Sequence, residues 1–285
     1  MSIQSTIEAS ISTLTPSLAR VATAVRDDPQ LVLVKTINQL ADDCDTSVAS
    51  VVRFCQAIGL NGYAQLRMEL AGELGKESAQ FGSMAFGADI SQSDTLIEGA
   101  AKIAQLEILA IDESISRLDY GRLADAVDAI DGAERILLYG VGASQFVAQD
   151  LGHKLMRIGR TAFALSDPHV ALAAAALPIP GTVALGFSHL GETRETCDFL
   201  RAATENGAAT VGLTGVKGST LDRLVDIALF TEVRETTFRA AAMVSRIAQL
   251  AVVDCLFVGV AQRRYPDTVE ALRRTREATR PARGV

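Results

Sequence analysis

Hydrophobic residues recur at helical spacing through the first quarter of the chain. Ile3, Ile7 and Ile11 fall on one helical face, and apolar residues continue at intervals of three and four as far as Leu74. Asp27-Asp28-Pro29 interrupts this pattern. We therefore predict that residues 1–74 are all-helical, with a last helix from about Tyr63 to Leu74.

Two short helices within this region are joined by a tight connector, Asp42-Asp43-Cys44-Asp45. Thr36 is placed to cap the first helix and Ser47 the second, and Gly59 follows the second as a C-terminal stop. Such a pair is typical of a helix-turn-helix, whose second helix enters the major groove of DNA. The residues expected to face the DNA are Thr36, Ser47, Ala49, Ser50 and Arg53.

A helical bundle without a ligand fits the same periodicity. The segment also has more Asp and Glu than Lys and Arg, whereas phosphate binding depends on basic residues. Periodicity alone therefore leaves both interpretations open. Residues 77–94 are rich in Gly, Ser, Gln and Ala and show no periodicity, so we place a linker there between domains at 1–76 and 95–285.

The rest of the chain alternates between short apolar runs and helical patterns. The runs expected to be strands are Ile136–Tyr139, Ala162–Leu165, Thr182–Phe187, Thr210–Leu213 and Ile227–Phe230. A long final helix is expected from about Glu235 to Gly259. Strand–helix alternation predicts an α/β domain of three layers, in which helices flank both faces of a parallel sheet.

Polar, glycine-bearing loops follow these runs, where parallel sheets bind their ligands. Gly140-Val141-Gly142-Ala143-Ser144 joins a strand to a helix N-terminus, and its amides and hydroxyl could hold an anion. Ser188 and Thr193 bracket Gly191 in a second loop of the same kind. Gln145 stands where a dinucleotide fingerprint needs glycine, and no P-loop lysine follows. Two hydroxyl-rich loops favour a sugar phosphate.

Several single residues could extend this site. Asp167 ends the second run, where an acid can hold a ribose, so a nucleotide-binding module is a third possibility. His169 and His189 could be acid–base groups or ordinary loop histidines. Glu235 precedes the last helix and could reach ligand hydroxyls or lie on the surface.

Composition narrows the class of protein. The chain is 48% apolar and 21% charged with a net charge of −7, which suits a globular protein and argues against a wholly nucleic-acid-attracting surface. The four cysteines are well separated along the chain, which predicts buried, reduced thiols and no metal site, and we expect no cofactor. No signal peptide is visible, so we expect a cytoplasmic protein. The longest apolar stretch contains Arg246 and Asp254 and is expected to be buried in protein.

With both halves in view, the chain resembles the RpiR-type bacterial transcription regulators, which join a helix-turn-helix domain to a SIS (sugar isomerase) domain. The resemblance rests on Leu40-Ala41, Ser47, Val51-Val52-Arg53-Phe54-Cys55 and Ile58-Gly59, on the two loops at 140–144 and 188–193, and on Ser245-Arg246-Ile247-Ala248-Gln249-Leu250. The chain departs from the family pattern at Gln56, Ala57 and Leu190.

The resemblance implies a DNA-binding regulator whose SIS domain senses a phosphorylated sugar. The implied effector-binding residues are Gly142, Ala143, Ser144, Asp167, His169, Ser188, His189, Gly191, Glu192, Thr193 and Glu235. The long last helix is apolar on more than one face, so we expect a homodimer or homotetramer on a two-fold operator. The alternative is a sugar-phosphate isomerase with a helical appendage.

Overall fold

The computed structural model describes residues 3–81, 93–233 and 242–278. Its residues cluster into two compact units, the first formed by Met1–Glu113 with Glu232–Ala240 and the second by Ser114–Thr231 with Ala241–Val285. We refer to them as the helical unit and the sheet unit. The domain boundaries expected at residues 76 and 94 stay a prediction.

The helical unit confirms the all-helical prediction for the N-terminal region. Its elements are α1 (Ile3–Ser10), the 3-10 helix η1 (Ile11–Thr13), α2 (Pro16–Asp27), α3 (Gln30–Val34), α4 (Ile37–Asp43), α5 (Val48–Ala57), α6 (Tyr63–Phe81) and the greater part of α7 (Leu96–Ser116). Val21, Leu40, Val51 and Phe54 are fully buried in its core, which joins α2, α4 and α5.

One helix differs from the prediction. α6 continues past Leu74 to Phe81 and so enters the segment expected to be a linker. Between Leu74 and Phe81, Gly75 is the only residue with a strong helix-breaking tendency. Most of the residues that follow it favour helix, namely Lys76, Glu77, Ala79 and Gln80. Gly and Ser content was therefore a poor guide to where this helix ends.

The sheet unit contains five parallel strands in the order β2-β1-β3-β4-β5. The strands are β1 (Arg135–Gly140), β2 (Ala162–Leu165), β3 (Thr182–Phe187), β4 (Ala209–Thr214) and β5 (Ile227–Phe230), so each predicted run forms a strand. The three inner strands, β1, β3 and β4, are almost entirely buried, as expected when helices cover both faces, whereas the edge strands β2 and β5 are only partly buried.

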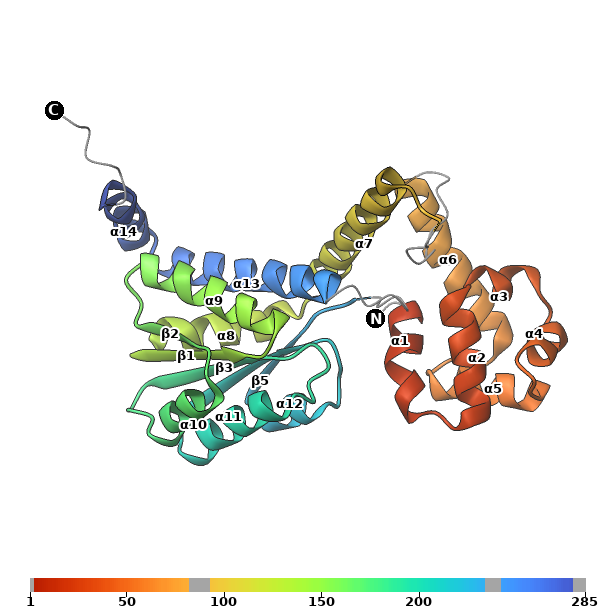
Figure 1. Ribbon diagram of the computed structural model, residues 1–285, viewed down its shortest axis with the longest axis horizontal. Helices are drawn as coiled ribbons and strands as arrows, with labels where there is room; N and C mark the ends of the chain where they lie inside the picture. The colour runs from red at the N-terminus through yellow and green to blue at the C-terminus, as the bar shows by residue number, and fades with distance from the viewer. Residues whose placement is uncertain (1–2, 82–92, 234–241, 279–285) are drawn as a thin grey trace. The chain divides into compact units, whose positions relative to one another are not determined.

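Two layers of helices enclose this sheet (Figure 1). One layer holds α8 (Tyr120–Gly132), α9 (Ala143–Arg157) and α13 (Met243–Arg263), and the other holds α10 (Pro168–Ala176), α11 (Arg194–Glu205) and α12 (Thr220–Leu224). A final helix, α14 (Tyr265–Ala278), follows α13. The three-layer α/β prediction is confirmed.

Helix α13 is long and apolar enough to cross a membrane by length and composition. In the structure it is a core helix, because Val252, Val253, Leu256 and Val260 pack against α8, α9 and the sheet with at most 1% of their surface exposed. Burial of this face in protein, as predicted, therefore accounts for part of its hydropathy, since 39% of its most apolar window is buried. Its predicted start at Glu235 lies outside the described residues.

All four cysteines are free thiols. Cys44, Cys55 and Cys197 are buried as expected, and burial raises the pKa of Cys55 to about 11. Cys255 is only half-buried, because it lies beside the core-facing residues of α13 rather than among them.

Candidate functional site

The two glycine-bearing loops lie beside each other at the carboxyl edge of the sheet. β1 is bordered by β2 on one side and β3 on the other, so the chain order reverses between β1 and β3, where open parallel sheets bind ligands. Gly140 pairs with Phe187 across these strands. A Cβ on Gly140 would come within 2.7 Å of the Ser144 carbonyl oxygen and 3.1 Å of the Phe187 carbonyl oxygen. Glycine is thus what allows the loops to approach.

The first loop ends at the N-terminus of α9. Gly142 is its N-cap and has φ 61° and ψ −124°, a conformation that favours glycine. Ser144 follows in the first turn, half-buried, where backbone amides and the helix dipole favour an anion. The Ser144 hydroxyl donates to Oε1 of Gln249 on α13 at 3.1 Å.

Gln249 was missed as a site residue by sequence reasoning. The residue is 1% exposed, and its neighbours in α13 are mainly apolar. A lone amide inside an apolar helix was the available signal, because a buried amide normally needs a polar partner.

The second loop is held by its own hydrogen bonds. Ser188 is 3% exposed and shares a 2.9 Å hydrogen bond with the Thr193 hydroxyl, while the Gly191 amide donates to the Ser188 hydroxyl at 3.1 Å. Gly191 has φ +68°, and a Cβ there would lie 2.2 Å from Oγ of Ser219. The geometry fixes two hydroxyls and one amide beside the first loop.

His189 and Leu190 form the turn of this second loop. The Thr214 hydroxyl and the Gly215 amide both donate to the His189 carbonyl, at 3.0 Å and 2.8 Å. The backbone of His189 therefore anchors the loop to the end of β4. Leu190 is 46% exposed.

Glu192 has a structural partner on the neighbouring helix. Its carboxylate accepts from the Thr220 hydroxyl at 2.7 Å and from the Thr220 amide at 2.8 Å, at the N-terminus of α12. Thr220's hydroxyl and amide together lower the pKa of the Glu192 carboxyl. In this geometry the carboxylate stabilises the contact between the second loop and α12.

This lowered pKa makes part of the stability depend on pH. A carboxyl whose pKa is lower in the folded state stabilises the fold above its ordinary pKa and loses that effect as pH falls through the folded value. We expect Glu192→Gln to remove this contribution, so that the stability difference from the parent shrinks between about pH 5 and pH 3. Urea unfolding at stepped pH measures it. Thr220→Val should give the same trend, and a difference independent of pH would contradict the assignment.

The remaining sequence candidates lie at the end of β2 or beyond the described residues. Asp167 accepts from the Val170 amide at 2.9 Å and caps α10, and His169 is exposed in the first turn of that helix. β2 borders β1, so both residues are at the same edge of the sheet as the first loop. Glu235 lies outside the described residues.

The helix-turn-helix has the capping predicted for it. Thr36 and Gln39 form a capping box at the start of α4, and Ser47 accepts from the Ser50 amide at 3.2 Å at the start of α5. Thr36, Ser47, Ala49 and Arg53 are exposed. Ser50 is only 5% exposed, so its expected outward position is wrong: it lies on the face of α5 that buries Val51 and Phe54.

Arg20 on α2 holds the turn between α4 and α5. Its Nε donates to the Cys44 carbonyl at 2.9 Å, and a terminal nitrogen donates to the Asp45 carbonyl at 2.6 Å. Asp45 has φ 47°, in the left-handed region that non-glycine residues rarely adopt. These bonds fix the angle at which α5 is presented. No local pattern in the sequence links Arg20 to the turn.

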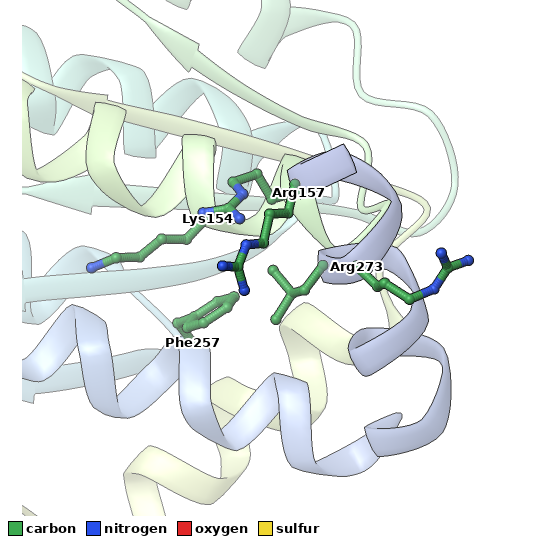
Figure 2. Close-up of a pocket in the computed structure, with 6 residues that line it drawn as sticks. Lys154, Arg157, Phe257 and Arg273 are labelled. Atoms are coloured by element: carbon green, nitrogen blue, oxygen red, sulfur yellow. The ribbon is translucent and has the colours of Figure 1, made fainter. Parts of the chain in front are cut away.

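A cavity of about 470 Å³ lies elsewhere in the sheet unit, at the last turn of α9 (Figure 2). The cavity is lined by Lys154, Arg157, Phe257, Leu272, Arg273 and Arg276. Lys154 is paired with Asp150 and Asp254, and Arg273 with Glu270 and Glu277. Figure 2 shows Arg157 directed toward Phe257 and Arg273 directed away from it. Carboxylates thus neutralise much of the positive charge that lines the cavity. The cavity lies at the opposite end of α9 from Ser144.

Comparison with protein families assigns both units. Residues 1–77 match the helix-turn-helix domain of the rpiR family, and residues 129–259 match the SIS domain. An uncharacterised HTH-type transcriptional regulator of Caldanaerobacter subterraneus subsp. tengcongensis is 40% identical over 266 residues, which are 93% of each chain. The HTH-type regulator YbbH of Bacillus subtilis is 32% identical over 95% of this chain and 94% of its own.

Solved structures are also similar to this chain. The NanR protein of Vibrio vulnificus, solved in complex with ManNAc-6P, superimposes with a TM-score of 0.60 and 26% identity over 97% of both chains. The sugar isomerase domain of an RpiR transcription factor from Sphaerobacter thermophilus matches 62% of this chain and 98% of its own, with a TM-score of 0.56 and 24% identity. The latter likeness concerns the fold alone.

Proposed function

Because the chain belongs to the rpiR family of transcription regulators, which join a helix-turn-helix to a SIS domain, we propose that a phosphorylated sugar controls its binding to operator DNA. The observation that carries the proposal is the adjacency of the two loops after β1 and β3. Ser144, Ser188 and Thr193 supply hydroxyls there, next to the N-terminus of α9. Hydroxyls and amides at a helix start are suited to a phosphate.

The likeness to NanR supports the choice of ligand class. That protein was solved with ManNAc-6P, and it spans nearly the whole of this chain. Asp167, His169 and His189, at the same edge of the sheet, are our candidates for the sugar hydroxyls. We propose binding rather than turnover, since the relatives that span the chain are named as regulators.

The helix-turn-helix supplies the DNA contacts in this proposal. Thr36, Ser47, Ala49 and Arg53 are exposed on α4 and α5, and a second copy of the chain would present the same residues to the other half of a two-fold operator. The sugar phosphate can shift DNA affinity only by binding the two arrangements of the protein unequally.

Removal of the hydroxyls that are proposed to bind the phosphate gives the direct test. We expect the parent protein to melt at higher temperature with a matching sugar phosphate, because a ligand at 100 times its Kd stabilises the fold by about 2.7 kcal/mol. The double variant Ser144→Ala, Ser188→Ala should lose that shift. Melting across a panel of sugar phosphates that includes N-acetylmannosamine 6-phosphate measures both.

Thr204→Ala, an exposed hydroxyl change at the far end of α11, should keep the shift and serves as control. A double variant that melts like the parent with ligand would place the phosphate elsewhere.

A second experiment distinguishes a regulator from an enzyme. It measures binding of the protein to the DNA upstream of its own gene, with and without the same compounds. Turnover of a ketose phosphate without sequence-specific DNA binding would overturn the proposal.

Self-association has its own test. Val258 of α13 is 50% exposed, and Phe146 and Met156 of the neighbouring α9 are 61% and 56% exposed, so this helical layer presents an apolar surface suited to a second copy. We expect Val258→Asp to weaken the oligomer at least tenfold, because a charge would be buried in the contact. Analytical ultracentrifugation checks this, with Thr204→Asp, at an exposed position of α11 in the other helical layer, as control. An unchanged sedimentation profile would exclude this surface.

A further inference from the structure

Gln249 contacts the first loop from the second turn of the core helix α13. Only 1% of its surface is exposed, and Oε1 lies 3.1 Å from the Ser144 hydroxyl, a contact between residues 105 positions apart in the chain. Its Nε2 has no hydrogen-bond partner among the residues that the structure describes. A buried amide donor left without a partner costs stability and calls for a functional reason.

The proton count at Ser144 supplies such a reason. A serine hydroxyl has one proton, and an ionised phosphate oxygen is an acceptor only. In the arrangement observed, Ser144 donates its proton to Gln249, so it presents only lone pairs to an incoming anion. The Ser144 hydroxyl cannot donate to a phosphate in this state.

The second loop does not have this difficulty. The Ser188 and Thr193 hydroxyls carry two protons and share one hydrogen bond, and Ser188 accepts a further one from the Gly191 amide. One hydroxyl proton of the pair therefore remains for a ligand. Of the two loops, the first therefore needs a rearrangement before its serine hydroxyl can donate to a ligand.

Rotation of the Gln249 amide would provide that rearrangement. The oxygen and the NH2 group of an amide have almost the same size, so exchanging them displaces no neighbouring atom. After the exchange Nε2 donates to the Ser144 oxygen, and the Ser144 proton is free to point at the ligand.

We propose that Gln249 is a positioning residue for effector binding, whose amide rotates when a phosphate enters, so that the Ser144 hydroxyl accepts from Gln249 and donates its proton to the phosphate. The inference rests on the proposed function and assigns a role within the same site. It predicts discrimination, because an unphosphorylated sugar offers no anion to favour the rotated amide. On this proposal, the stability that is lost by leaving Nε2 of Gln249 without a partner is the consequence of a site that selects for phosphate.

Gln249→Met separates this role from a structural one. Methionine is of similar length and apolar, so the variant removes the unsatisfied donor and should fold at least as stably as the parent. The Kd for N-acetylmannosamine 6-phosphate, measured by calorimetry, should nevertheless rise about tenfold, since nothing then orients the Ser144 proton. Gln262→Met, the same change at an exposed position of α13, should alter neither property.

A double-variant cycle tests whether Gln249 acts through Ser144. In a Ser144→Ala background, Gln249→Met should weaken binding by less than twofold, because the group that it orients is absent. Inorganic phosphate, measured as a second probe, should show the same coupling, since the proposal concerns the phosphate alone.

Gln249→Glu gives a pH signature. An ionised carboxylate can only accept from Ser144 and also repels the phosphate, so at pH 8 the Kd should exceed that of Gln249→Met. At lower pH the buried carboxyl gains a proton and can donate to Ser144, so the ratio of its Kd to the parent's should fall toward one. In a Ser144→Ala background only the charge repulsion remains, so the ratio should change less with pH there, and an equal change in both backgrounds would contradict the orienting role.

Parent affinity in Gln249→Met, or equal weakening with and without the Ser144 hydroxyl, would overturn the inference and leave the proposed function standing. A parent protein that binds neither the sugar phosphates nor inorganic phosphate would overturn the proposed function, and this inference with it. The outcomes thus distinguish the two.

Discussion

Gly191→Ala is expected to lower the free energy of unfolding of the sheet unit by about 2–5 kcal/mol and to abolish sugar-phosphate binding. A non-glycine residue at the φ of +68° found here costs about 1–2 kcal/mol. The new Cβ would also lie 2.2 Å from Oγ of Ser219 and 2.9 Å from Oγ1 of Thr214, and overpacking of this kind costs about 1–3 kcal/mol. The loop must move to relieve the overlap, which separates Ser188 and Thr193 from the first loop.

Gly207→Ala is the matched control. Gly207 has φ +85°, but a Cβ there would meet nothing within 4 Å. Only the backbone cost of about 1–2 kcal/mol should appear, with ligand affinity unchanged. Urea unfolding and calorimetry measure the pair. Equal losses of stability in the two variants would show that contact with Ser219 does not restrain the second loop.

Phe54→Ala should destabilise the helical unit by about 3–5 kcal/mol, because the side chain is fully buried between α5 and its neighbours and its loss leaves a cavity. Helix α5, which we propose reads the operator, would lose its packing, so operator binding should disappear together with the fold. Circular dichroism during urea unfolding reports the stability, and fluorescence anisotropy with labelled operator DNA reports the binding.

The adjacent residue separates the two effects. Arg53 is exposed on α5, so Arg53→Ala should leave the unfolding curve within about 0.5 kcal/mol of the parent. Operator affinity should fall about tenfold and the salt dependence of binding by about one ion, as expected for a lost phosphate contact. Full operator affinity in Arg53→Ala would contradict the orientation assigned to α5, whatever Phe54→Ala shows.

Local chemistry explains why so much of the helix-turn-helix was predictable. Ser47 caps α5 through a bond to the amide three residues ahead, and Gly59 has the positive φ of a helix stop. Both interactions are settled within a few residues of sequence. Ser50 could not be placed in the same way, because its burial depends on which face of α5 meets α2.

In the sheet, too, some features follow from nearby residues and others depend on tertiary packing. Runs such as Thr182–Phe187 are apolar throughout, so a strand buried on both faces could be recognised without a structure. The order β2-β1-β3-β4-β5 could not, because nothing in a strand's own residues states which neighbour it pairs with. That order is what places the loops after β1 and β3 side by side.

By itself, the sequence determined the helices, the strands, their caps and the polar loops that carry Ser144, Ser188 and Thr193, because hydrophobic periodicity and turn chemistry act over short distances along the chain. Tertiary structure alone decided the partners of these groups. Arg20 reaches the turn at Asp45, and Gln249 reaches Ser144, only because packing rotates α2 and α13 into position. Such contacts depend on the whole core, so no local pattern records them.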